Sequence, residues 1–304
     1  MSNPSLVIVG SIGIDHIETP SEKRGGILGG SASYACAAAS YFTSPGMVGV
    51  VGDDFPQAFL DLYQSFDVNL DGLQRAKGRT FSWTGVYEEN MDNRSTLETV
   101  LGVFENFEPK LPESYLDAPY VFLGNMHPGL QLHVLDQIRA PKFVLADTMD
   151  LWINITRGEL EQVIGRVHML TLNESEARLL TDRHTLLDAA DALLKMGPDH
   201  VLIKKGEHGS MLFSRQGAFI QPAFPLGRVT DPTGAGDTFA GAVMGYLAEH
   251  DACDEAAIRR AMVHGSVVAS FGVEAFTLDR LQSLRKPEID RRVEDLLGMM
   301  RVDL

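Results

Sequence analysis

Short apolar runs that alternate with amphipathic stretches constrain the fold of this chain more than any other feature. The runs typical of buried strands are residues 5–10, 46–51, 119–124, 142–147, 167–172 and 199–204. The helical patterns are residues 29–42, 55–65, 130–139, 174–181, 185–196, 234–249, 255–271 and 288–300. Strands that alternate with helices predict an α/β fold, in which helices cover both faces of a mostly parallel sheet.

One region departs from this alternation. Residues 79–103 are rich in Thr, Val, Trp and Tyr and contain a polar turn, EENMDN, at 88–93, which is typical of a hairpin. Residues 12–28 also contain strand-like segments. We therefore predict a small second sheet built from 12–28 and 79–103, with the alternative that the hairpin only adds a layer to the core.

Polar residues follow several of the apolar runs. Asp15, Asn125, Asp147, Asn173 and the loop at 231–237 each come just after such a run. Ligands of open parallel sheets bind beyond the carboxyl ends of the strands. These residues are therefore expected to meet in one site.

The segment DPTGAGDTFAGA at 231–242 opens a helix whose apolar face includes Phe239, Val243 and Leu247. An exposed helix N-terminus attracts anions, and a carboxylate in its first turn, Asp237, could act as a base. The alternative is ordinary capping, since first-turn acids contribute only about 0.3–1 kcal/mol and glycines are common in turns. Gly-Ala-Gly directly before an acid favours close approach of a ligand to the backbone.

Residues 231–244, DPTGAGDTFAGAVM, resemble the C-terminal signature of the PfkB (ribokinase-like) family of carbohydrate and nucleoside kinases. The resemblance implies a ribokinase-like three-layer α/β/α sandwich over residues 1–304, with the small sheet as a lid over the acceptor. It implies transfer of the ATP γ-phosphate to a hydroxyl group. Asp237 would be the catalytic base, and the amides of Gly234, Ala235, Gly236 and Asp237 would form an anion hole.

Other segments resemble motifs of the same family, in the same order. They are GSIGID at 10–15, GGSASYACAAAS at 29–40, NESE at 173–176, KKGEHGSMLF at 204–213 and HGSVVASFGVEAF at 264–276. The acceptor-binding residues predicted from the resemblance and from strand-end positions are Asp15, Gly29, Gly30, Tyr34 and Asn125. Those predicted to bind the nucleotide are Asn173, Lys204, Gly206, Gly209, Thr233 and His264. Glu176 would bind Mg²⁺ through water, and Asp231 is a candidate ligand of a monovalent cation such as K⁺.

The acceptor is less well defined than the reaction. Tyr34 stands where many members have an asparagine that contacts sugar hydroxyls, so we expect a small sugar or, alternatively, a nucleoside of the adenosine, cytidine or inosine type. Turn or capping roles remain alternatives for Asp15 and Asp231, and a structural role for His264. The first strand is not followed by GxGxxG, and the chain has no GxxxxGK[ST], which disfavours nicotinamide and P-loop enzymes.

The net charge and composition restrict the kinds of molecule that this chain is expected to bind. The net charge of −15 argues against nucleic acids and anionic membranes. ATP is itself anionic, so Mg²⁺, helix N-termini and a few cations such as Lys204 or Lys205 must neutralise it. No apolar run reaches the roughly 18 residues of a membrane span, and the cysteines, Cys36 and Cys253, have no metal or redox spacing. We expect a cytoplasmic enzyme, and the resemblance implies a homodimer formed through the lid.

Overall fold

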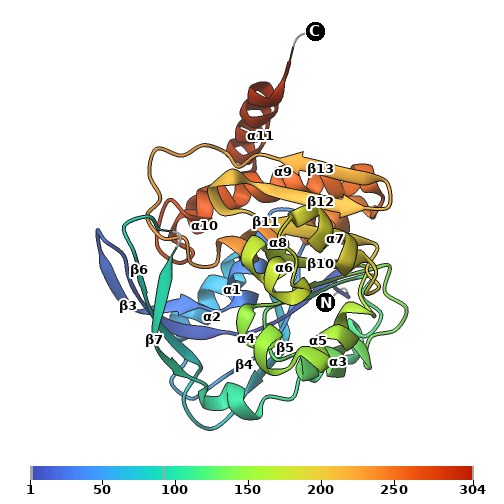
Figure 1. Ribbon diagram of the computed structural model, residues 1–304. Helices are drawn as coiled ribbons and strands as arrows, with labels where there is room; N and C mark the ends of the chain where they lie inside the picture. The colour runs from blue at the N-terminus through green and yellow to red at the C-terminus, as the bar shows by residue number, and fades with distance from the viewer. Residues whose placement is uncertain (1–2, 92, 303–304) are drawn as a thin grey trace.

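The computed structural model describes residues 3–91 and 93–302, which form a large and a small sheet (Figure 1). The large sheet has nine strands in the order β13-β12-β11-β10-β9-β8-β1-β4-β5. They are β1 (Leu6–Val9), β4 (Gly46–Val51), β5 (Asn69–Arg75), β8 (Tyr120–Leu123), β9 (Phe143–Asp147), β10 (Met169–Asn173), β11 (His200–Lys204), β12 (Ser210–Ser214) and β13 (Gly217–Gln221). All neighbours from β11 to β5 pair in parallel, and β12 and β13 add an antiparallel edge.

Helices cover both faces of this sheet, as the alternating pattern predicts (Figure 1). They are α1 (Ser31–Ala39), α2 (Gln57–Ser65), α3 (Pro128–Leu135), α4 (Asp150–Ile155), α5 (Arg157–Ile164), α6 (Glu174–Thr181), α7 (Leu186–Leu194), α8 (Ala235–His250), α9 (Glu255–Gly272), α10 (Asp279–Ser283) and α11 (Lys286–Met300). Leu6 and Ile8 of β1 pack in the cluster that includes α1, α8 and α9, whereas Val7 and Val9 pack toward α3 and α5. The three-layer α/β/α prediction is confirmed.

The small sheet is separate from the large one. Its strands are β2 (Gly13–Glu18), β3 (Lys23–Gly29), β6 (Ser82–Tyr87) and β7 (Arg94–Val100), in the order β3-β2-β6-β7. The β2–β3 and β6–β7 pairs are antiparallel, and β2 pairs with β6 in parallel. The predicted hairpin and second sheet are therefore confirmed; Asp92, in the predicted turn, lies outside the described residues.

Hydrogen bonds fix the segments that connect the two sheets. Thr80 is buried, and its amide and hydroxyl donate to Asp54 Oδ1 at 2.8 and 2.7 Å. The amide of Gly52 donates to the Thr80 hydroxyl at 3.0 Å. On the return segment, Gly102 has φ 54°, and a Cβ there would lie 2.2 Å from the carbonyl oxygen of Arg79. The small sheet is thus attached to the body at a defined position.

The apolar runs locate the six predicted strands, but β5, β12 and β13 are not anticipated. β13 has mostly exposed side chains, and β5 has a mixed polar sequence, so neither shows the pattern of a buried strand. The short helices α4, α5 and α10 are also missed, and the short 3₁₀ segments are Gly102–Asn106, Glu113–Tyr115 and Gly206–His208. Across the described ranges, none of the helices is both long and apolar enough to cross a bilayer.

Candidate active site

The loop before α8 supplies backbone donors at a helix N-terminus. Gly234 is the N-cap residue, has φ 72°, and provides no side-chain cap for the first turn. The Ala235 amide donates to the carbonyl of Pro232 at 3.2 Å, so the loop itself uses this predicted member of the anion hole. The amides of Gly236 and Asp237 follow at the start of the helix, where donors have no intrahelical acceptor. The loop therefore retains the elements of an anion site.

Two side chains pack against this loop and explain its glycines. A Cβ at Gly234 would lie 2.3 Å from Cγ of the Tyr34 ring, and one at Gly236 would lie 3.2 Å from Lys204 Nζ. A Cβ atom cannot lie 2.3 Å from the Tyr34 ring, so no side chain fits at position 234. The left-handed backbone of Gly234 also disfavours other residues. The protein itself thus requires a glycine at 234, and the Lys204 ammonium lies beside the loop.

A buried ion pair connects two strand ends next to the loop. Lys204 Nζ, at the end of β11, lies 2.8 and 3.0 Å from the carboxylate oxygens of Asp147, at the end of β9. Burial alone would lower the pKa of Lys204, but Asp147, Glu176 and Asp237 outweigh it and raise the pKa. Lys204 therefore carries its positive charge into the centre of an acidic cluster.

Asp237 lies in this cluster. The pKa of its carboxyl is raised to about 7, chiefly by burial and also by Asp147, while the cations Lys204 and Arg94 oppose the shift. A general base is most effective when its pKa lies near the working pH. The environment of Asp237 thus suits proton transfer at neutral pH.

The predicted NxxE motif forms a capping box at the start of α6. Asn173 Oδ1 accepts from the Glu176 amide at 2.8 Å, and Glu176 Oε2 accepts from the Asn173 amide at 2.7 Å. The pKa of Glu176 is raised to about 7, chiefly by burial. Lys204 lowers this pKa and Asp147 raises it. The motif is therefore a structural cap whose carboxylate also faces the acidic cluster.

Asp15, on β2, is a buried carboxylate of the small sheet. Its Oδ1 accepts from the Trp83 amide of β6 at 3.2 Å, and the residue is only 3% exposed. Burial raises its pKa to about 7, with Asp231 adding to the shift and the Trp83 hydrogen bond reducing it. A Cβ at Gly29 would lie 1.8 Å from Asp15 Oδ2, and Gly30, with φ 94°, is the N-cap of α1. The double glycine therefore makes room for Asp15 and starts α1.

Two predicted acceptor residues have different environments. Tyr34 is buried, and its hydroxyl has no hydrogen-bond partner among the described residues. Asn125 is occupied on both sides of its amide: Oδ1 accepts from Trp152 Nε1 at 2.9 Å, and Nδ2 lies 3.1 Å from Met149 Sδ. Asn125 thus joins the ends of β8 and β9.

The small sheet touches the loop through Tyr87. The Thr233 and Tyr87 hydroxyls are 3.0 Å apart, and the Thr233 amide donates to Asp231 Oδ1 at 2.9 Å. Asp231 is buried, which raises its pKa, and the Thr277 amide lies 3.5 Å from its Oδ2. Asp231 and Thr233 therefore order the approach to α8 and connect it to β6.

His264 packs on helix side chains away from the loop, and the KxGxxG glycines form a tight turn after β11. His264 contacts the rings of Phe42 and Tyr246, and Tyr246 lies eleven residues, or about 16 Å of helix, beyond the start of α8. His264 therefore does not lie at the loop that precedes α8. Gly206 and Gly209 have φ 55° and 88°, and a Cβ at Gly209 would lie 2.0 Å from the carbonyl oxygen of Gln221. The turn after Lys204 thus requires Gly209 for its own packing.

Asp147, expected at the site from its position after an apolar run, forms the ion pair with Lys204, although no role was assigned to it. Two further side chains near the loop, Tyr87 and Arg94, were not predicted as site residues. Tyr87 and Arg94 flank the polar turn of the hairpin and are paired in register across β6 and β7. Their positions relative to the loop depend on how the small sheet is placed, which local sequence does not show.

The residues at the site fit a Mg²⁺ ion that is bound together with a nucleotide better than a metal ion that is held by protein side chains alone. Within the described ranges, no group of three or more His, Cys, Asp or Glu residues could hold a metal ion. Mg²⁺ in phosphoryl-transfer sites is bound by phosphates, waters and one or two carboxylates. The Gly236–Asp237 amides, Lys204 and the Glu176 carboxylate match that requirement.

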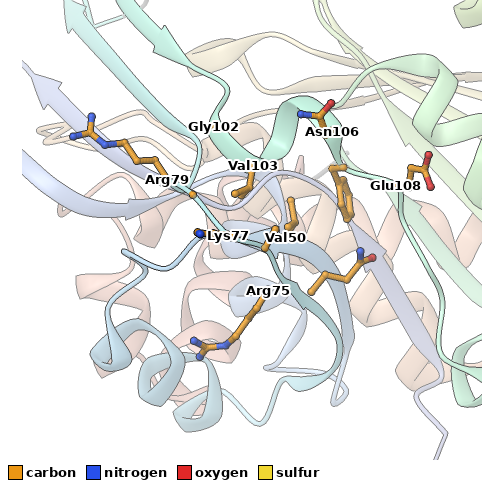
Figure 2. A pocket seen from close by; sticks show the side chains of 12 residues that line it. Val50, Arg75, Lys77, Arg79, Gly102, Val103, Asn106 and Glu108 are labelled. Atoms are coloured by element: carbon orange, nitrogen blue, oxygen red, sulfur yellow. The ribbon is translucent and has the colours of Figure 1, made fainter.

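A groove of about 400 Å³ lies elsewhere, along the segments that connect β5 to β6 and β7 to the following 3₁₀ segment (Figure 2). Arg75, Lys77, Arg79, Gly102 and Asn106 are among its lining residues. Figure 2 shows the Arg75 and Arg79 side chains pointing in different directions. None of the predicted site residues lines this groove, and its cations do not converge on one point.

Comparison with known proteins identifies the family of this chain. The model of the pfkB family of carbohydrate kinases matches residues 3–275. A cytidine kinase from Thermococcus kodakarensis is 32% identical over 251 residues, which is 80% of this chain and 87% of that protein. ATP and Mg²⁺ fit kinases of this family.

Two solved structures share the fold. A nucleoside kinase from Burkholderia thailandensis in complex with inosine has a TM-score of 0.79 at 20% identity, covering 96% of this chain and 97% of that one. A putative ribokinase II from E. coli in complex with ATP and Mg²⁺ has a TM-score of 0.77 at 18% identity, covering 97% and 100%. The family match and the cytidine kinase relative place the chain in the pfkB family, as a phosphotransferase that acts on a hydroxyl group.

Proposed function

We propose that this chain is an ATP-dependent nucleoside kinase that phosphorylates a ribosyl hydroxyl. The observation that carries the reaction is the Asp237 carboxyl at the uncapped start of α8, beside the Lys204–Asp147 ion pair. Similarity to a cytidine kinase supports a nucleoside acceptor, because it extends over 80% of the chain.

In this mechanism Asp237 accepts the proton of the acceptor hydroxyl. The acceptor oxygen then bonds to the γ-phosphorus as the bond from this phosphorus to the β–γ bridging oxygen breaks, and ADP leaves. The amides of Gly236 and Asp237 donate to the phosphoryl oxygens, where charge accumulates. Lys204 holds Asp147 away from the phosphates and offsets its charge.

Asp15 is assigned to the acceptor. Its carboxylate is held by the Trp83 amide and by the space left at Gly29, so its free lone pairs can accept from two ribosyl hydroxyls. A pKa of about 7 means that it is partly protonated at neutral pH in the absence of acceptor. Hydrogen bonds from the diol favour the ionised form and would lower that pKa.

The remaining assignments follow from position. Glu176 would bind Mg²⁺ through water, and Mg²⁺ neutralises charge on the phosphates when bound. Asp231 would contribute to a monovalent-cation site at the approach to α8. We also propose that residues 1–304 act as one domain and that the small sheet is a lid over the acceptor, excluding water during transfer.

An ADP-release assay with ATP and Mg²⁺ tests the acceptor. Cytidine, adenosine, inosine, ribose, inositol and sugar phosphates are compared, each with K⁺ or Na⁺. We expect kcat/KM to be highest for a nucleoside, and preference for ribose or inositol would contradict the proposal. Asp237→Asn should abolish turnover while ATP binding, measured by calorimetry, is retained.

A homodimer through the small sheet is a separate proposal. Leu97 of the edge strand β7 is 64% exposed, and an apolar side chain on an edge strand favours contact with a second copy. Light scattering after gel filtration should give twice the 33.3 kDa chain mass. Leu97→Lys should restore the monomer, whereas a monomeric parent protein would contradict the proposal.

A further inference from the structure

The C-terminal helix α11 lies beyond the part of the chain that matches the family. The match to the pfkB family covers residues 3–275, whereas α11 is Lys286–Met300. The helix packs against α9 (Figure 1), and its buried side chains, Ile289, Val293 and Leu296, join the core cluster that includes α8 and α9. Its polar side chains have contacts of their own, which the family motifs do not explain.

One of these side chains, Arg292, connects three segments. Its guanidinium carbon lies 3.4 Å from the centre of the Phe271 ring and 4.8 Å from that of Phe224. Its Nη2 lies 2.8 Å from the Glu274 carboxylate, and its Nη1 donates to the Ser270 hydroxyl at 3.0 Å. The side chain is 18% exposed. A planar guanidinium can stack on rings and donate to a carboxylate at the same time, which an ammonium cannot do.

Arg280 of α10 strengthens the same cluster. Its guanidinium carbon lies 4.8 Å from the centre of the Phe271 ring, and its Nε lies 3.3 Å from Glu274. Its Nη2 lies 2.7 Å from the carboxylate of Glu288, in the first turn of α11. Glu274 is therefore held by two guanidinium groups, and its position is fixed relative to both α10 and α11.

The position of Glu274 matters because its neighbour Val273 anchors the approach to α8. The Val273 carbonyl accepts from the amides of Thr230 and Asp231 at 2.8 and 3.3 Å. Asp231 begins the loop before α8, and its Oδ1 accepts from the Thr233 amide at 2.9 Å. The contacts made by α11 are thus connected to the loop through one short segment of backbone.

We propose that Arg292 is a positioning residue for phosphoryl transfer. Through Phe224 and Glu274 it holds residues 224–231, which lead into the loop before α8. The start of α8 then presents its amides to the transferred group in a fixed position. A displacement of about 1 Å from productive geometry can cost about 10²-fold in rate. The inference deepens the proposed kinase reaction and rests on it for the group that the amides bind.

Substitution of Arg292 tests this role in the ADP-release assay. Arg292→Gln removes both the ring stacking and the ion pair, and we expect kcat to fall about 10–100-fold. The KM for acceptor should change less than threefold, because Asp15, which is assigned to the acceptor, lies on the small sheet. Arg292→Lys keeps a charge beside Glu274 without the planar stack, so its kcat should be intermediate. Arg291→Gln is the matched control, since Arg291 is the exposed neighbour on the same helix, and it should keep the kcat of the parent protein.

Hydrogen exchange tests the positioning without turnover. In Arg292→Gln, the amides of residues 230–238 should exchange about tenfold faster, because local opening of this segment becomes easier. The amides of β1 should keep their rates, and Arg291→Gln should change neither region. Because no nucleotide or acceptor is needed, this result does not depend on the kinase assignment. A parent protein that phosphorylates no acceptor would contradict the proposed function, and the exchange rates would still decide the role of Arg292.

The proposal is wrong if kcat of Arg292→Gln stays within threefold of the parent value. It is also wrong if exchange at residues 230–238 is unchanged, or if it accelerates equally there and in β1, since equal acceleration indicates a general loss of stability. Urea unfolding shows whether each variant is folded under the assay conditions. Should Arg292→Gln not fold, Arg292→Lys is judged by the same criteria.

Discussion

Replacing Lys204 with methionine perturbs the centre of the candidate site in a way that can be measured as stability. The change leaves the Asp147 carboxylate, which is 5% exposed, without the ammonium that lies 2.8 Å away. Removal of one member of a buried ion pair costs about 3–5 kcal/mol. Lys204 is 19% exposed, so water can replace part of the interaction, and we expect about 3 kcal/mol. At roughly 2–4 °C per kcal/mol, the melting temperature should fall by about 6–12 °C.

The neighbouring residue provides the matched control. Lys205 pairs with Glu174 at 3.0 Å, but the two side chains are 24% and 39% exposed. Such pairs contribute only about 0–1 kcal/mol, so Lys205→Met should be nearly neutral. The double variant Lys204→Met/Asp147→Asn removes both buried charges and should regain most of the stability. Urea unfolding of all four proteins measures these differences.

Activity should respond in the same variant. Lys204 lowers the pKa of Asp237, so its loss should move the acid limb of kcat/KM to higher pH. Equal unfolding free energies for Lys204→Met and Lys205→Met would refute the assignment of Lys204 as a buried partner. A shift of the acid limb to lower pH would refute the proposed electrostatic coupling.

The remaining predictions concern the base and two glycines. Activity should rise through about pH 7 as Asp237 ionises. Because folding raises its pKa from 3.8 to about 7, Asp237 lowers stability as pH rises from about 4 to 7, and the loss is complete above that range, so Asp237→Asn should melt higher than the parent at pH 8 but not at pH 4. Gly234→Ala should cost more than about 1–2 kcal/mol, the penalty of its left-handed φ of 72°, because the new Cβ would also meet the Tyr34 ring; urea unfolding measures this loss. Gly29→Ala would displace the Asp15 carboxylate, 1.8 Å from the new Cβ, and should raise the KM for acceptor far more than that for ATP.

The sequence predicts the buried part of the fold well and its edges poorly. Central strands such as Leu6–Val9 and Phe143–Asp147 are buried on both faces, so each is a continuous apolar run. The edge strand Gly217–Gln221 is mostly exposed and has no such run. Edge strands form because a neighbour offers hydrogen-bonding groups, which is a tertiary property and leaves little trace in local sequence.

The same distinction applies to the site. The signature around Asp237 identifies the loop, because a local pattern of glycines and an acid forms the start of α8. The partners of the loop come from elsewhere: Tyr34 from α1, Lys204 from β11 and Arg94 from β7. Only the packing of three elements brings them together. The contact of His264 with Tyr246 likewise depends on the packing of α9 against α8 and not on local sequence.

Burial also explains how a protein of net charge −15 can bind a triphosphate. That formal charge counts every carboxylate as ionised, whereas Asp15, Glu176 and Asp237 have pKa values raised to about 7, chiefly by burial. Near neutral pH these groups are partly protonated, so the site is less anionic than its composition indicates. Acidification would therefore favour binding of the phosphates while it disables the base. The two effects oppose each other around pH 7.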